Sequence, residues 1–148
     1  AQAVFDVRNV PAPVLAMFWL RERIVGLLGI AKGRPDTFAV DKIADGEARG
    51  HFTVRPEMCN GHGTAQGGFL FTFADSLFAG ACNSTGNMAV AAQVGIHYIA
   101  PARAGDVVEG HAVERRTWGR NGITDVTLTS NGQVIAEFRG TSRTVRGV

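Results

Sequence analysis

The stretch between Asn60 and Asn83 holds the residue types whose spacing could do chemistry. It opens with a glycine-rich segment, in which Gly67 and Gly68 stand directly before an apolar run. Glycine lets the backbone approach a ligand closely, and the first N–H groups of a helix have no partner within that helix. A helix that begins here would offer backbone donors to an anion or to an oxygen that develops negative charge.

Asp75 is the only charged side chain in the apolar run. An unpaired carboxylate among apolar neighbours is costly or takes up a proton, so a chain tolerates it where it has a task. An ion pair or a subunit contact is the structural alternative, and it stays open at this point. Gly67 and Asp75 are about two helical turns apart, so one helix would carry donors at its start and a carboxylate at its middle. In two packed copies, the donors of one could face the carboxylate of the other.

The apolar run after Gly68 predicts a long buried helix. Phenylalanine, leucine and alanine dominate it, and no helical register leaves a polar stripe wide enough to face water. The run is about twice as long as an ordinary strand, and it is too short for a membrane span, which needs roughly twenty apolar residues. We therefore expect the rest of the fold to cover this helix on every side.

Strands are expected on both sides of this helix along the chain. Alternating side chains and turn residues predict them at about 38–43, 47–54, 89–100, 107–117, 122–130 and 133–145. Asp45-Gly46 and Asn131-Gly132 suit tight turns, and the second pair is the stronger hairpin signal because a type I′ turn needs positive φ at both central positions. One face of the strand at 89–100 is expected to carry Val90, Ala92, Val94, Ile96 and Tyr98.

This order of elements predicts an α+β fold in a single domain, residues 1–148. Consecutive hairpins give antiparallel pairs, so we expect a curved antiparallel sheet wrapped around the long central helix, with the last four strands in meander. Residues 1–36 are expected to form an N-terminal arm and a helix at about 14–28, because Pro11 and Pro13 suit a first helical turn.

Composition excludes several classes of function. The net charge of +2 is too small to indicate nucleic acid or an anionic membrane as a partner, although it is compatible with an anionic small ligand. A hydrophobic share of 45% with 19% charged residues suits a globular chain that buries surface in an oligomer. Two cysteines form no disulfide framework and no signal peptide is evident, so we expect a cytoplasmic protein. Cys59 and His62 lack a second pair of ligands, so no metal is expected.

One family of enzymes, the hotdog-fold acyl-CoA thioesterases of the phenylacetate-degradation (PaaI) type, resembles this chain in three segments: NGHGTAQGGFLFTFADSLFAGACNS, AVAAQVGIHYIAPARAGD and EFRGTSR. The likeness spans roughly residues 27–145. It implies a hotdog fold, which agrees with the topology predicted above. It also implies a homo-oligomer, a dimer at least and a tetramer by family expectation, that hydrolyses an aromatic acyl-CoA of the phenylacetyl or hydroxyphenylacetyl type. No cofactor is implied.

The resemblance also assigns roles by position. In that family the thioester lies between subunits, near the helix start of one and the acidic residue of the other. Asp75 would then act as nucleophile or as base for water, Gly67 N–H would polarise the thioester carbonyl, and Asn60 would orient substrate or water. Where the family commonly has His-Gly-Gly, this chain has Gln66 before its two glycines. A glutamine amide can donate a hydrogen bond but cannot titrate near neutral pH.

Further residues are candidates for substrate binding, and each also has an ordinary structural interpretation. They are His62, Gln66, Gly68, Phe71 and Gln93. Phe71 and Phe78 suit a hydrophobic core equally well. Coenzyme A carries phosphates that arginines could meet, and the candidates are Arg103, Arg115, Arg116, Arg120, Arg139 and Arg143.

Two other functions stay open from the sequence. A hotdog hydratase or dehydratase would move a proton at carbon and leave the thioester intact, but the histidine usual for that role is not evident. A non-catalytic acyl-CoA binding or sensing module would not need Asp75. Such a module is expected to carry an added domain, for which 148 residues leave little room.

Overall fold

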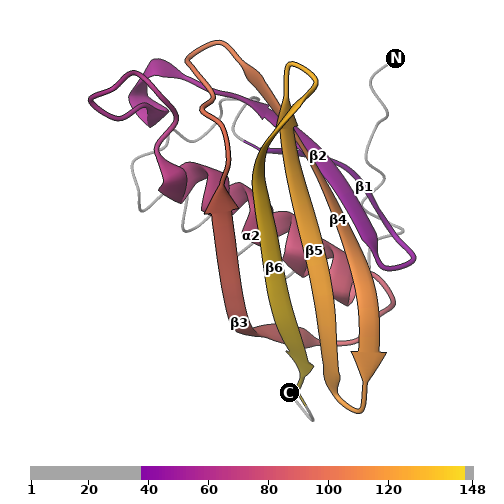
Figure 1. Cartoon of the computed structure of the whole chain (residues 1–148). Helices are drawn as coiled ribbons and strands as arrows, with labels where there is room; N and C mark the ends of the chain where they lie inside the picture. The colour runs from indigo at the N-terminus through magenta and orange to yellow at the C-terminus, as the bar shows by residue number, and fades with distance from the viewer. Residues whose placement is uncertain (1–37, 146–148) are drawn as a thin grey trace.

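The computed structural model describes residues 38–145. Six strands and one long helix make up this part of the chain (Figure 1). The N-terminal arm and helix expected within residues 1–36 lie outside the described residues. Within 38–145, no helix is long and apolar enough to cross a bilayer.

The strands and the long helix fall where the sequence pattern predicts them. The strands are β1 (Ala39–Ala44), β2 (Glu47–Thr53), β3 (Ala89–Tyr98), β4 (Val107–Trp118), β5 (Asn121–Ser130) and β6 (Gln133–Thr144). A 3-10 helix, η2 (Pro56–Met58), follows β2, and the long helix is α2 (Gly67–Asn83). Both tight turns are confirmed, because φ is positive at each central residue, 53° and 80° at Asp45-Gly46 and 52° and 75° at Asn131-Gly132.

These strands form one antiparallel sheet in the order β1-β2-β4-β5-β6-β3, and α2 crosses one of its faces (Figure 1). This is the expected hotdog arrangement. The expectation of four strands in meander is wrong for β3, which pairs with β6 at the sheet edge instead of with β4. The connection from β3 to β4 is no tight hairpin because it is tied to the glycine-rich loop, where Ala65 N–H donates to Ala102 O at 2.8 Å.

A bulge in β3 changes which side chains face the helix. The register against β6 shifts between Ala91 and Gln93, so the two ends of the strand are out of phase. Val90 is therefore paired with Arg143 on the outer face of the sheet, whereas Val94 packs against the core on the helix side. The expected single apolar face of this strand is wrong for that reason.

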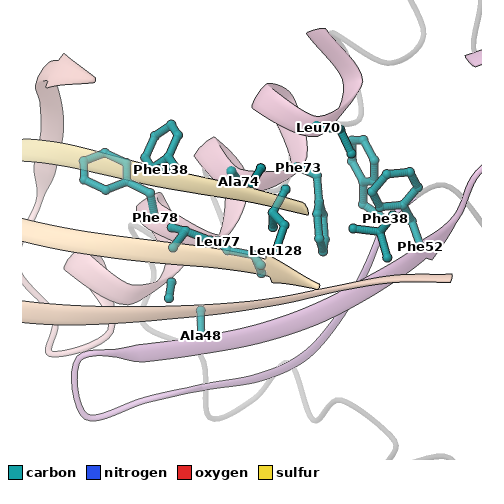
Figure 2. Packing of buried hydrophobic residues seen from close by; sticks show 14 of the residues in the cluster. Phe38, Ala48, Phe52, Leu70, Phe73, Ala74, Leu77, Phe78, Leu128 and Phe138 are labelled. Carbon is teal, nitrogen blue, oxygen red and sulfur yellow. The ribbon is translucent and has the colours of Figure 1, made fainter. Parts of the chain in front are cut away.

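The core lies between α2 and the sheet, and glycines let the helix come close. Phe38, Phe52 and Phe73 pack together at one end, with ring centroids 4.9 to 5.3 Å apart (Figure 2). Farther along, Phe78 lies against Phe138 with centroids 5.7 Å apart. A Cβ built at Gly140 would lie 2.5 Å from the Phe78 ring, so this strand position needs glycine for the helix to pack on it.

The residues that the structure describes do not cover the long helix on every side. Nine of its residues are buried, and these face the sheet. Thr72, Asp75, Ser76 and Ala79 follow one another at helical spacing and are only half-buried, with Gly68 exposed at the start of the same row. We call these five residues the uncovered stripe. The sequence pattern did not reveal it because its residues are small and mostly uncharged.

Candidate active site

The start of α2 presents backbone donors that have no partner in the described part of the chain. Gln66 is the N-cap residue with extended backbone dihedrals, and its side chain makes no capping hydrogen bond. No hydrogen bond to a described residue involves the N–H of Gly67 or Gly68. A Cβ at Gly68 would meet nothing within 4 Å, so a ligand has room to approach these N–H groups. The arrangement suits an oxyanion at the helix start.

Asn60 shapes the loop that leads to this helix. Its side-chain Oδ1 accepts from His62 N–H at 2.9 Å and from Thr64 N–H and Oγ1 at 3.3 and 3.2 Å. The Asn60 N–H also donates to Thr64 O at 2.8 Å. The carbonyl half of the amide is thus used to fold the loop, whereas the NH₂ half makes no hydrogen bond to a described residue.

Asp75 lies in the middle of α2 on the uncovered stripe. Its carboxylate forms no hydrogen bond or ion pair with any described residue. Desolvation by burial raises the pKa of this carboxyl above its usual value. The ion pair considered from the sequence therefore does not form in the described part of the chain, and the carboxylate is a stronger base than an exposed aspartate.

One chain alone does not bring donor and carboxylate to the same carbonyl. Gly67 and Asp75 are eight positions apart on one helix, which is about 12 Å along its axis. Groups that act on one reacting centre must approach it to about 3 to 3.5 Å. A site that uses both groups therefore needs the helix of a second copy.

The other predicted site residues divide between two faces of the sheet. His62 and Gln66 are exposed in the loop and at the cap of α2, beside Gly67 and Gly68. Phe71 lies edge-on against Phe138 with ring centroids 5.6 Å apart, at the border of the core. Gln93 is not brought together with them. It lines a groove of about 460 Å³ on the outer face of the sheet, with Asp125 and Arg139.

The candidate arginines differ in whether they form ion pairs with described residues. Arg139 donates to Asp125 at 2.6 and 2.8 Å, and Arg115 donates to the same carboxylate at 3.3 Å. The hydrogen bond from Arg139 is the main cause that lowers the pKa of Asp125. These two arginines serve an ion-pair cluster on the outer face. No ion pair with a described residue involves Arg103, Arg116, Arg120 or Arg143, which keeps these four as candidates for phosphate binding.

Sequence reasoning missed one side chain at this site. Tyr98 lies at the end of β3, and its hydroxyl donates to Gly67 O at 2.9 Å. Tyr98 and Gly67 are 31 positions apart in the sequence, so no local pattern connects them. The sequence showed only that Tyr98 lies in an alternating strand.

Comparison with known proteins agrees with this fold and gives the family of the chain. The thioesterase superfamily model matches residues 62–137, so the chain belongs to the thioesterase superfamily. It is 40% identical to the Escherichia coli acyl-coenzyme A thioesterase PaaI over 96 residues, which cover 64% of this chain and 69% of the relative. Within the superfamily it belongs with the PaaI-type hotdog thioesterases, and it is a thioester hydrolase.

Solved structures give the same assignment. The E. coli PaaI protein from the phenylacetic acid degradation operon superposes with a TM-score of 0.77 at 30% identity, covering 90% of this chain and 92% of that one. A variant of the phenylacetic acid degradation protein PaaI from Thermus thermophilus gives a TM-score of 0.70 at 40% identity, covering 73% and 93%. Between hydrolysis and the two alternatives weighed from the sequence, the assignment favours hydrolysis.

Proposed function

We propose that this protein hydrolyses an aromatic acyl-CoA, of the phenylacetyl or hydroxyphenylacetyl type, to the free acid and coenzyme A. One observation carries the proposal: α2 combines the N–H donors of Gly67 and Gly68 with the desolvated carboxylate of Asp75, and none of these groups has a partner within residues 38–145. The aromatic acyl group is supported by the relatives, two of which are named for phenylacetic acid degradation.

The site forms between two copies of the chain. β3 is an edge strand whose outer side pairs with no described strand. Apolar side chains are exposed along it, with Val90 50% accessible in the strand and Ile99 57% accessible directly after it. Such an edge is protected when it pairs with another strand. Antiparallel pairing of two β3 strands about a two-fold axis would extend the sheet and bury these side chains.

The same pairing places the reacting groups together. α2 runs antiparallel to β3, because its start is bonded to Tyr98 and its end to Ala89. Two β3 strands paired about a two-fold axis therefore set the two α2 helices side by side and antiparallel. When the axis passes midway between the positions of Gly67 and Asp75, the start of one helix faces the middle of the other and the uncovered stripes meet. A tetramer would consist of two such dimers.

The reaction follows from these groups. Asp75 takes a proton from water, whose oxygen bonds to the thioester carbon, while the N–H groups of Gly67 and Gly68 hold the oxyanion. When the carbonyl forms again, the C–S bond breaks and the sulfur leaves with its electron pair. The sulfur then takes the proton from Asp75, which regenerates the carboxylate.

The test is thiol release from a panel of acyl-CoAs: phenylacetyl, hydroxyphenylacetyl, benzoyl, and short to medium aliphatic. We expect turnover to concentrate on the aromatic group and Asp75→Asn to lower kcat by about 10² to 10⁴-fold. Asp41→Asn is the matched control, because it makes the same change at an exposed carboxylate of β1, which contacts the His51 ring at 2.8 Å. Full activity in Asp75→Asn would show that the catalytic assignment is wrong.

Two further measurements address the finer parts of the proposal. Single-turnover hydrolysis in heavy-oxygen water should place the label in the released acid, whereas label in Asp75 would show nucleophilic attack. Light scattering should find a dimer or a tetramer, and a monomer would exclude the shared site. We also propose a cytoplasmic location, which the two free thiols, Cys59 and Cys82, support.

A further inference from the structure

Tyr98 makes two contacts with Gly67, the first residue of α2. Its hydroxyl donates to Gly67 O at 2.9 Å. Its ring also lies over the Cα of that residue, because a Cβ built at Gly67 would be 2.7 Å from Cζ and 2.9 Å from the hydroxyl oxygen of Tyr98. The backbone at Gly67 is not in the left-handed region, so the contact with Tyr98, and not φ, makes glycine necessary at this position.

The position of Tyr98 is itself fixed by the sheet. Tyr98 is the last residue of β3 and pairs with Ala136 of β6. The next residue, Ile99, donates its N–H to Ile135 O at 2.8 Å. Tyr98 therefore connects the start of α2, which has no side-chain cap, to the part of β3 that is paired with β6.

The hydrogen bond acts on one particular peptide group. No peptide bond among the described residues is cis, and in a trans peptide the carbonyl oxygen and the amide hydrogen point in opposite directions. The carbonyl of Gly67 and the N–H of Gly68 belong to the same peptide. A donor on Gly67 O therefore holds that peptide plane in place, and it also polarises the Gly68 N–H, since hydrogen bonds in a chain strengthen one another.

From this geometry we infer that Tyr98 is a positioning residue for the oxyanion donors: it holds the Gly67-Gly68 peptide so that the N–H group of Gly68 faces the thioester carbonyl. Tyr98 acts through the peptide and does not touch the reacting atoms. Burial raises the pKa of the Tyr98 hydroxyl, which keeps it a proton donor throughout the neutral range. The inference depends on the proposed function, because it concerns the same reaction.

The experiment measures kcat and KM for the acyl-CoA that the wild-type chain hydrolyses fastest. Tyr98→Phe removes only the hydroxyl, so kcat should fall roughly tenfold with little change in KM, because the donors are misdirected and not lost. Tyr98→Leu also removes the ring and should cost more. Trp118→Phe is the matched control, since Trp118 is an exposed aromatic residue of a strand end remote from α2, and its kinetics should stay at the wild-type values.

A double-mutant cycle isolates the contact between the two residues. Gly67→Ala should lower kcat about 100-fold in the wild-type chain, because the new methyl group displaces the ring and the helix start. In the Tyr98→Ala background the methyl group occupies vacated space, so the same change should cost far less. Equal costs of Gly67→Ala in both backgrounds, or wild-type kcat and KM in Tyr98→Phe and Tyr98→Leu, would overturn the inference.

The outcomes separate this inference from the function on which it depends. If the wild-type chain released no thiol from any acyl-CoA, the proposed function would be wrong and the inference would fail with it. If the wild-type chain is active and Asp75→Asn is not, while the Tyr98 variants behave like wild type, only the role of Tyr98 is wrong. Tyr98→Phe retains the ring and its packing, so a folding defect in Tyr98→Ala would leave the test intact.

Discussion

The two ends of α2 treat their polar groups in opposite ways. At the C-terminal end, Asn83 is buried, donates to Ala79 O at 2.9 Å and to Ala89 O at 3.2 Å, and accepts from Ala89 N–H at 2.8 Å. Ser84 Oγ donates to Ala81 O at 2.8 Å and accepts from Gly46 N–H at 2.7 Å. At the N-terminal end no side chain caps the helix. The helix is anchored at one end and kept open for a ligand at the other.

This difference indicates how the chain separates stability from function. A capping side chain at the start of α2 would stabilise the helix by about 1 kcal/mol. The N-cap residue, Gln66, makes no such hydrogen bond. The helix start is held instead by contacts that leave the N–H groups of the two glycines available, among them Gln66 N–H to Met58 O at 2.8 Å and the Tyr98 hydroxyl to Gly67 O at 2.9 Å. The buried amide at the other end contributes stability that the open end lacks.

Asn83→Ala should produce the largest loss of stability among the variants that compare the two ends. The change leaves the buried N–H of Ala89 without its acceptor and removes two further hydrogen bonds, so we expect a loss of about 2 to 4 kcal/mol. Urea unfolding measures it. The value of kcat in native buffer should change little, because Asn83 is at the far end of the helix from Gly67. Ser84→Ala, a less buried change at the same end, should cost less.

Gln66→Ser tests the uncapped start of α2 by adding a side chain that can cap it. A serine at the N-cap can accept a hydrogen bond from the first-turn N–H groups, so the midpoint of thermal unfolding should rise, by an amount that corresponds to about 1 kcal/mol. The same bond takes a donor away from the thioester, so kcat should fall. Gln66→Ala is the control that removes the amide without adding a cap. A serine variant that gains stability with undiminished kcat would show that the open end has no catalytic use.

Much of this architecture could be predicted from the sequence, because it depends on local signals. Periodicity gave the strands and the helix, and Asn131-Gly132 gave the hairpin through its backbone preference. The pairing of β3 with β6 could not be predicted, since it joins segments far apart in the chain. The bulge between Ala91 and Gln93 has no sequence mark, so the prediction that Val90 shares a face with Val94 was wrong.

The candidate site likewise contains residues that a local sequence pattern reveals and contacts that no local pattern reveals. Asp75 and the glycines could be found because each breaks a local pattern, a charge in an apolar run and two flexible residues before a helix. The contact of Tyr98 with Gly67 could not be found, because a tyrosine in an alternating strand breaks no pattern. Asn60 was identified as a site residue, but its use in folding the loop depends on the positions of His62 and Thr64 backbone atoms.

The smallest expected effect is on the pH dependence of stability, and it compares two aspartates away from the helix ends: Asp75 in the middle of α2 and Asp125 in β5. Desolvation by burial raises the pKa of Asp75, whereas the hydrogen bond from Arg139 is the main cause that lowers the pKa of Asp125. As pH rises from about 4, the unfolded chain loses the proton of residue 75 before the folded chain does, so Asp75 lowers the free energy of unfolding at neutral pH. Asp75→Asn should therefore raise the midpoint of thermal unfolding at pH 7, and this gain should shrink toward pH 4.

Asp125 should show the opposite sign. Its carboxylate is favoured in the folded state, so its contribution to stability is present above its unfolded pKa and is lost as pH falls through the lower folded value. Asp125→Asn should therefore lower the unfolding midpoint at pH 7, with a difference that shrinks in acid. Thermal unfolding of both variants and of the wild type between pH 4 and pH 8 measures the two slopes. If Asp75→Asn also lowered the midpoint at pH 7, Asp75 would have a stabilising partner in solution. The contrast between an unpaired Asp75 and a paired Asp125 would then be wrong.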